Sequence, residues 1–173
     1  MKKIILTTLT TAVLSQPLFA IDHEKIADAL LVLIPSATLG TELYYDNKEG
    51  QTQFYKSFAS NAVITYGLKY GVNRTRPNGE KYSFPSGHTS ATFQSASFIH
   101  KRYGFKYALP AYLGASYVGY SRVHTNAHYK SDVLAGAVIG TLSSFYFTTN
   151  YKNFEIKPIA LNSGYGIGIQ TTW

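Results

Sequence analysis

The stretch Phe84-Pro85-Ser86-Gly87-His88 decides how this chain folds, because it marks the point where a loop turns into a helix. The turn signal Asn78-Gly79 lies just upstream, so the segment before the helix is expected to be a loop. Ser86 can accept a hydrogen bond from the first turn and so cap the helix. Free amides at a helix start point toward anions, and Gly87 lets the backbone approach a ligand closely. The sequence therefore predicts an anion site at this helix start.

Helical patterns lie on both sides of this stretch, and together they predict an all-α fold. The expected helices are residues 24–45 with a kink or break at Pro35-Ser36, Gly50 to about Arg74, Ser86 to about Arg102, Pro110 to near Ser121, and His128 to about Phe147. The last 20 residues instead alternate around Asn162-Ser163-Gly164, which is typical of a β-hairpin. We therefore expect a bundle of about five core helices with a short C-terminal β-hairpin over residues 154–172.

The N-terminus has the features of an export signal. Lys2 and Lys3 supply the charged region, residues 4–14 form a short apolar stretch, and Ala20 is the small residue before a cut. With 173 residues and 45% apolar content, the chain can form one folded domain. We expect a signal peptide at residues 1–20 and a single domain at residues 21–173, with its functional core at about residues 50–148. An uncleaved anchor is the alternative.

Two later apolar windows, residues 107–120 and 133–148, are shorter than the roughly 20 residues that a bilayer core needs. The first expected helix also carries Asp28 and Glu42. Core helices of a soluble, exported, periplasmic protein are therefore expected. The 15 tyrosines leave contact with a membrane surface open, because their amphipathic rings suit the headgroup level.

The composition excludes several kinds of chemistry. The chain has no cysteine, which excludes disulfides, a thiolate nucleophile and a Cys-based zinc site. From Tyr66 onward, eleven Lys or Arg stand against three acidic residues, a net charge of +8. Such a surface attracts anions, although an ordinary solvated cationic surface has the same composition. No nucleic-acid-binding module is recognisable, so phosphorylated small molecules or lipids are the expected partners.

Lys69 and Arg76 lie seven residues apart, close to two helical turns, so both cations can project from one side of a helix end. Pro77 biases Arg76 away from helical geometry and turns it back toward the site. The two side chains could clamp phosphate oxygens, or they could simply favour the helix dipole. Arg74 and Lys81 flank the site and could meet a distal phosphate or headgroup, although a solvated role is expected.

His88, His128 and Asp132 are the candidates for proton transfer and nucleophilic attack. His88 in the first helical turn could protonate a leaving oxygen. Asp132 follows His128 by four residues, so on one helical face it could orient the ring and present the other nitrogen as a nucleophile. A capped helix with an exposed histidine and a surface His-Asp pair are the structural alternatives. A metal site is disfavoured, because Lys69 and the neighbouring arginines would repel a divalent cation.

Three clusters in order, Lys69-x6-Arg76-Pro77, Pro85-Ser86-Gly87-His88 and Ser121-Arg122-x5-His128-x3-Asp132, resemble the signature of the type 2 phosphatidic acid phosphatase family. The superfamily of that family includes bacterial acid phosphatases and vanadium haloperoxidases. The resemblance covers residues 69 to 132, and the flanking helical pattern is compatible with it.

The resemblance implies a metal-independent phosphatase without a cofactor, acting on phosphomonoesters or pyrophosphate ends, possibly of lipids. It assigns the nucleophile that forms a phosphohistidine to His128, the orienting carboxylate to Asp132 and the acid and base to His88. It assigns phosphate binding to Lys69, Arg76, Ser86, Gly87 and Arg122. Vanadate-dependent halide oxidation and non-catalytic binding of phosphate or a lipid headgroup are the alternatives.

Overall fold

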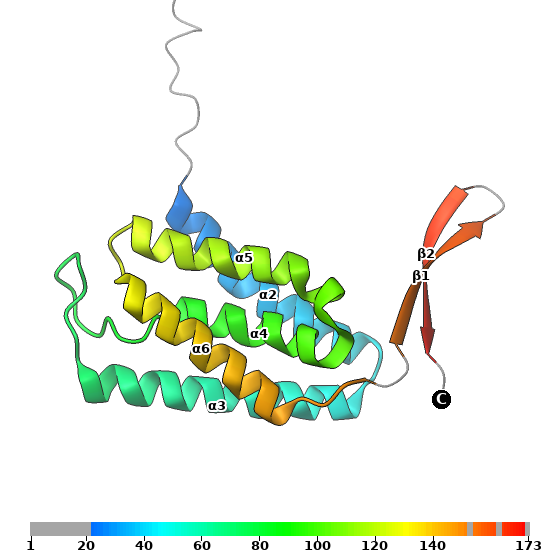
Figure 1. The fold of residues 1–173 in the computed structure, drawn as a ribbon, viewed down its shortest axis with the longest axis horizontal. Helices are drawn as coiled ribbons and strands as arrows, with labels where there is room; N and C mark the ends of the chain where they lie inside the picture. The colour runs from blue at the N-terminus through cyan, green and yellow to red at the C-terminus, as the bar shows by residue number, and fades with distance from the viewer. Residues whose placement is uncertain (1–21, 152–153, 162–163, 172–173) are drawn as a thin grey trace, which may run out of the picture.

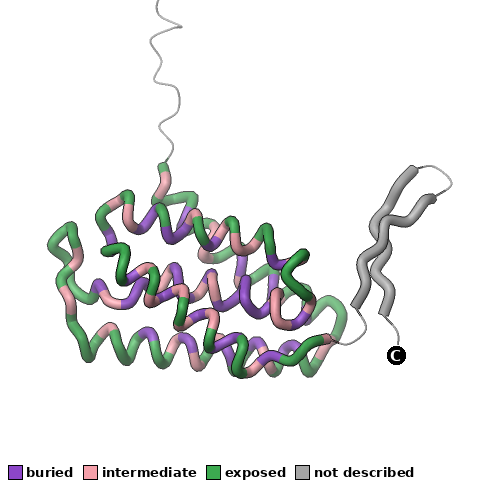
Figure 2. Tube along the Cα trace, in the orientation of Figure 1, coloured by how far each residue is buried: buried purple, intermediate pink, exposed green. Residues whose placement is uncertain are grey.

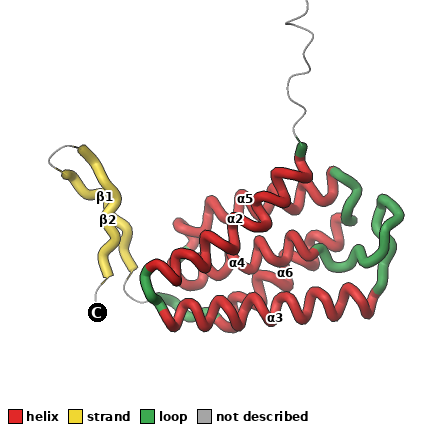
Figure 3. Tube along the Cα trace, turned by 180° about the vertical axis from the view of Figure 1, so that it is seen from behind, coloured by secondary structure: helices red, strands yellow, loops and turns green. Residues whose placement is uncertain are grey.

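The computed structural model describes residues 22–151, 154–161 and 164–171. Within residues 22–151, five helices lie roughly side by side in a bundle (Figure 1). They are α2 (His23–Tyr44), α3 (Lys48–Val72), α4 (Gly87–Tyr103), α5 (Phe105–His124) and α6 (Lys130–Phe147). The loop between α3 and α4 and the turn between α5 and α6 lie at the same end of this bundle (Figure 3). This end carries all three sequence clusters.

The closest helix contact in the bundle joins α4 and α6, and it depends on two glycines. A Cβ atom on Gly136 would lie 2.5 Å from the carbonyl oxygen of Ser86, and one on Gly140 would lie 2.2 Å from that of Ser90. Residues four apart lie on the same helix face, so the two glycines form one strip against α4. This small-residue contact brings the start of α4 against the start of α6, where Ser86 N–H donates to the Asp132 carbonyl at 3.0 Å.

The bundle buries many polar side chains and exposes many apolar ones. Thr65, Ser90 and Gln94 are buried, and they belong to a set of buried Ser, Thr, Asn and Gln side chains in the described bundle. By contrast, Val32 on α2 is 66% exposed and Leu134 on α6 is 67% exposed. Buried and exposed positions alternate along every helix (Figure 2), and the buried positions hold polar and small residues beside apolar ones such as Phe54 and Phe98. In soluble bundles, apolar side chains mostly face the core and polar ones mostly face the solvent.

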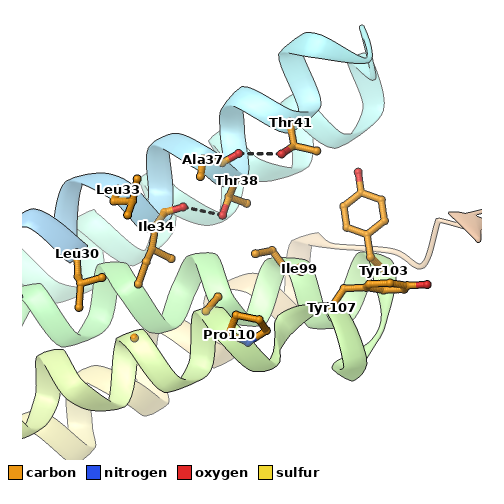
Figure 4. Close-up of a pocket in the computed structure, with 12 residues that line it drawn as sticks. Leu30, Leu33, Ile34, Ala37, Thr38, Thr41, Ile99, Tyr103, Tyr107 and Pro110 are labelled. Carbon is orange, nitrogen blue, oxygen red and sulfur yellow. Dashed lines mark hydrogen bonds between the residues drawn. The ribbon is translucent and has the colours of Figure 1, made fainter. Parts of the chain in front are cut away.

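Among the described helices, α2 is long and apolar enough to cross a membrane, judged by its length and composition. It runs without a break through Pro35, where a kink or break was expected, and its 22 residues span about 33 Å. A groove of about 430 Å³ separates it from α4 and α5 (Figure 4). Thr38 and Thr41 border this groove, but their hydroxyls donate to carbonyls one turn back on α2, which leaves the lining apolar.

A buried charged network joins α2, α3 and α4 at the end of the bundle opposite the sequence clusters. Arg102 and Glu42 have fully buried side chains, with 3.7 Å between Arg102 Nε and Glu42 Oε2. Arg102 also donates to the side-chain oxygens of Gln53 and Asn47, both at 2.9 Å. The Tyr103 hydroxyl donates to the other Glu42 oxygen. We call these five residues the corner network.

The strands β1 (Phe154–Leu161) and β2 (Gly164–Thr171) pair antiparallel, from Phe154 opposite Thr171 to Leu161 opposite Gly164. They pair with each other and make no extensive contact with a described helix. The expected fold class is therefore corrected. The bundle over residues 22–151 is all-α and contains no strand, and the hairpin is not a part of it, because neither of its faces is packed into the bundle core. The expected signal peptide at residues 1–20 lies outside the described residues and has no structural support.

Two expected helix starts were wrong. Helix α5 begins at Phe105 and continues through Pro110, which was expected to open it. Helix α6 begins at Lys130 and not at His128, because the Asp132 side chain accepts a hydrogen bond from the Tyr129 N–H and so caps the helix two residues later. His128 therefore precedes the helix, and it does not share a helical face with Asp132.

Candidate active site

A cleft of about 410 Å³ runs along α3, between α2 and α4. Its polar part is formed by Lys69, Arg76, Gly87, His88 and His128, with Asn61, Thr65 and Ser90. Its apolar part is formed by Leu31, Phe58, Ala62, Tyr66 and Ala91. No Asp or Glu is among the described residues that line it. The cleft therefore combines a cationic end with an apolar end and is suited to an anion that carries an apolar group.

Lys69 is fixed by the loop that follows its helix. Its Nζ donates to the carbonyl oxygens of Tyr82 at 2.8 Å and Pro85 at 3.1 Å. These bonds hold the loop against α3, but carbonyls carry no full charge that would neutralise the ammonium group. Lys69 therefore keeps a net positive charge at the cleft.

Arg76 lies in the same loop and also lines the cleft. Its Nη1 atom is 2.8 Å from an exposed Glu80 carboxylate, and its backbone N–H donates to the Glu80 carbonyl at 2.7 Å. Its Nε atom is buried and has no hydrogen-bond partner among the described residues. A buried donor without a partner is costly, so this nitrogen is available to an oxygen of a bound anion.

Ser86 caps α4, as the sequence predicted. Its side chain is fully buried and shares a 3.0 Å hydrogen bond with the Thr89 hydroxyl, while Gly87 beside it lines the cleft. The Ser86 hydroxyl therefore lies behind the cleft surface, and the backbone around Gly87 faces it.

Asp132 is fully buried, and its oxygens are occupied by residues other than His128. Arg74 Nη1 donates to Oδ1 at 2.8 Å, whereas Ser83 and the Tyr129 N–H donate to Oδ2. His128 Nδ1 is 3.8 Å from Oδ2, too far for a hydrogen bond, and has no hydrogen-bond partner among the described residues. Asp132 thus approaches the ring but binds the loop before α4 instead.

The expectation that Arg74 is solvated was wrong. Besides Asp132, it binds the Ser131 hydroxyl at 2.9 Å, and its guanidinium lies 3.9 Å from the centre of the Tyr129 ring. A single sequence offers little signal for this role, because Arg74 precedes its partners by more than fifty residues.

His128 is buried beside two cations, and this lowers its pKa to about 4. Burial is the largest cause, followed by the charges of Arg76 and Lys69, whereas the Ser83 backbone and Asp132 act in the opposite direction. At neutral pH the ring is therefore uncharged and has a lone pair. A neutral imidazole beside fixed cations is suited to attack an electrophilic anion.

Arg122 lies behind the cleft and does not line it. It is buried, and its Nη2 atom donates to Asp28 Oδ1 on α2 at 3.0 Å. The same Asp28 oxygen is 3.0 Å from His88 Nε2. Sequence reasoning noted Asp28 only as a charge in an apolar helix. A charged residue within this mostly apolar helix was the available signal, and Glu42 on the same helix shares it.

The polar side chains of the cleft fit an anion better than a metal ion. Among the described residues, no group of three or more His, Cys, Asp or Glu side chains is arranged to hold a metal ion. Lys69, Arg76 and a buried neutral histidine instead converge on one space that contains no carboxylate.

Comparison with known proteins gives the family. Over 78 residues the chain is 44% identical to a lipid A 1-phosphatase of Porphyromonas gingivalis, covering 43% of this chain and 18% of that protein. Over 129 residues it is 30% identical to a lipid A 4'-phosphatase of Helicobacter pylori, covering 64% of this chain and 65% of the relative. The chain thus spans less than two thirds of either relative's length.

A crystal structure of Aquifex aeolicus LpxE shares the fold, with a TM-score of 0.66 at 24% identity, covering 76% of this chain and 86% of the other. The PAP2 superfamily matches residues 52–156, a range that contains all three sequence clusters and most of the bundle. The resemblance found in the sequence is confirmed: the chain belongs to the PAP2 superfamily.

Proposed function

We propose that this protein is a phosphatase that removes a phosphoryl group from a lipid through a phosphohistidine at His128. The observation that carries the proposal is the cleft itself, where Lys69 and Arg76 stand beside two histidines with no lining carboxylate. Phosphoryl transfer needs charge stabilisation and positioning more than covalent help from the protein. Fixed cations beside an uncharged imidazole supply both.

In the first step, a His128 ring nitrogen attacks phosphorus, and the bond between phosphorus and the leaving oxygen breaks. Nε2 is the nitrogen available, since Nδ1 faces Asp132. The leaving oxygen takes a proton from His88, which lines the same cleft. Lys69 and Arg76 stabilise the equatorial oxygens as charge develops.

In the second step, water attacks the phosphohistidine and gives its proton to His88. The bond between phosphorus and nitrogen breaks, inorganic phosphate leaves, and His128 returns to its neutral form. Neither step calls on a metal ion, because Lys69 and Arg76 supply the positive charge that a metal would supply and would repel a divalent cation.

The apolar part of the cleft supports a lipid substrate. Phe58 lies eleven residues before Lys69 on α3, about 16 Å along the helix axis, and Leu31 faces the same cleft from α2. A phosphate bound at Lys69 would thus have an apolar channel beside it. The names of the two lipid A phosphatase relatives agree with this substrate class.

The apolar exterior supports a position in a membrane. Exposed apolar side chains such as Leu113 and Leu134 cost little in lipid, and small residues such as Gly136 and Gly140 let helices pack closely. The sequence at residues 1–20 favours the periplasmic side for the site. We propose that the bundle lies in the membrane and opens its cleft there.

Phosphate release from the purified full chain tests the proposal, with lipid phosphates, isoprenoid diphosphates and small soluble esters as substrates. We expect lipid substrates to be preferred, a chelator to leave activity intact and His128→Ala to abolish it. Acid-labile radioactive phosphate should be trapped on the wild type but not on this variant. Full activity of His128→Ala would disprove the role of His128 as the nucleophile. Bromide oxidation with peroxide and vanadate, without hydrolysis, would show that the chain is an oxidase instead.

A further inference from the structure

We propose that Asp28, on the helix before the family-matched region, is a positioning residue that holds His88 and Arg122 for proton transfer to the leaving group. This proposal rests on the proposed function. The matched region begins at residue 52, so α2 adds a carboxylate from outside it.

The contacts of Asp28 are specific to the site. Its Oδ1 atom is 3.0 Å from His88 Nε2 and 3.0 Å from Arg122 Nη2, so one oxygen joins a residue of α4 to one of α5. Packing does not require a carboxylate here, because the Asp28 side chain is 54% exposed. Of the acidic residues on α2, Asp28 contacts His88 as well as Arg122, and these two contacts explain its position.

The start of α2 is fixed against the end of α5, which keeps Asp28 in place. The Ser121 hydroxyl donates to the His23 carbonyl at 2.7 Å, and Arg122 donates to the Glu24 carbonyl at 3.3 Å. The adjacent His23 ring binds the Tyr117 hydroxyl at 2.7 Å. The bonds of Ser121 and Arg122 tie α2 to the third sequence cluster itself, so the carboxylate is held at a defined distance from His88.

This geometry assigns different tasks to the two nitrogens of His88. The protonated ring donates its Nε2 proton to Asp28 and transfers its Nδ1 proton to the leaving oxygen as the bond to phosphorus breaks. Neutral His88 then keeps its proton on Nε2, and its Nδ1 lone pair can accept the proton of the attacking water. Asp28 stabilises the cationic ring and fixes which nitrogen faces the substrate.

Asp28→Asn tests the role, because it removes the charge but keeps the shape and an oxygen for Arg122. We expect kcat/KM for an alkyl phosphate to fall about 10- to 100-fold, since a positioned general acid contributes typically 10²- to 10⁴-fold. With p-nitrophenyl phosphate the loss should be less than about threefold, because that leaving group needs little protonation. Inhibition by inorganic phosphate should stay within about twofold, and Asp28→Glu should restore most activity.

Two controls separate this role from a general effect of acidic residues. Asp46→Asn makes the same chemical change at an exposed site beyond the other end of α2, where Asp46 pairs with Lys48, and should leave both substrates unaffected. Glu24→Gln removes a carboxylate 3.6 Å from Arg122 that does not contact His88, so it should not alter the leaving-group dependence.

Three results would overturn the proposal. An equal loss with both substrates would mean that Asp28 acts only on folding. Faster turnover and tighter phosphate inhibition in Asp28→Asn would mean that the carboxylate occupies the anion site. If the wild type releases no phosphate from any ester, the proposed function fails. Nitrogen NMR of the His88 ring then still tests whether Asp28 fixes which ring nitrogen carries the proton. We expect the neutral ring to carry its proton on Nε2, and to lose this preference in Asp28→Ala; a proton on Nδ1 in the wild type would refute the role.

Discussion

The two ends of the bundle differ in how they compensate buried charge. In the corner network, Arg102 and Glu42 are both fully buried and face each other across 3.7 Å. At the cleft, Lys69 and Arg76 share a space with His88 and His128 that no carboxylate lines. The corner network is balanced within itself, whereas the cleft has positive charge left over.

The unpartnered atoms show the same difference. In the corner network, the buried atoms without a hydrogen bond are Arg102 Nε and Glu42 Oε2, two groups of opposite charge that face each other. At the cleft, Arg76 Nε is a buried cationic donor without a partner among the described residues, and Asn61 Oδ1 is a buried neutral acceptor without one. A buried polar group without a partner costs free energy, so an imbalance of this kind marks a place for a ligand. Charge balance, and not burial, distinguishes the structural cluster from the functional one.

The largest expected effect breaks the corner network. Arg102→Ala leaves the Glu42 carboxylate buried without its partner and should lower the free energy of unfolding by about 3–5 kcal/mol. Thermal unfolding of the variant and of the exposed control Lys106→Ala measures this, and turnover per folded molecule should not change. An unchanged unfolding midpoint would show that the network does not stabilise the bundle.

The second effect concerns the cleft. Arg76→Leu should raise the activation free energy by about 3 kcal/mol, a rate loss of roughly 150-fold, because it removes a cation from the developing charge. The unfolding midpoint should hardly move, since the Glu80 partner is exposed. Glu80→Gln is the matched control and should keep activity, because the guanidinium remains. Equal losses in both variants would assign the effect to the ion pair and not to the cation.

A smaller effect on turnover is expected for Arg74, which binds Ser131 and Asp132 next to the cleft. Arg74→Lys keeps the charge but loses the planar group that binds Asp132 and Ser131 together and stacks on Tyr129. We expect kcat to fall roughly tenfold with little change in KM, because the loop carrying Arg76 shifts while the cations remain. Steady-state kinetics of this variant and of Ser131→Ala check this. A change in KM alone would contradict a positioning role.

The smallest expected effect is a change in the pKa of His128. The pKa of His128, lowered to about 4 by burial and by Arg76 and Lys69, leaves the ring neutral above that pH. An NMR titration of the ring should therefore show protonation near pH 4, and Arg76→Leu should move it upward by removing a like charge. A midpoint near 6.5 in the free protein would contradict this account of the cleft.

The sequence predicted the helical body and the family better than it predicted which side chains bind each other. Ser86 was identified as a helix cap because capping is a local interaction within one turn. The start of α6 was misplaced, because the Asp132 carboxylate that caps it was expected to serve His128 instead. Binding of Asp132 by Arg74 was missed for the same reason, since each carboxylate oxygen can accept from several donors and the fold selects among them.

By itself, the sequence determined to which family the chain belongs, since the three clusters keep fixed spacings along a single stretch. Only the tertiary structure decided which side chains bind each other. Asp132 meets Ser83 across 49 positions and Asp28 meets Arg122 across 94. A hydrogen bond requires atoms within about 3 Å and in line, and helix packing alone sets such distances between segments so far apart in the chain.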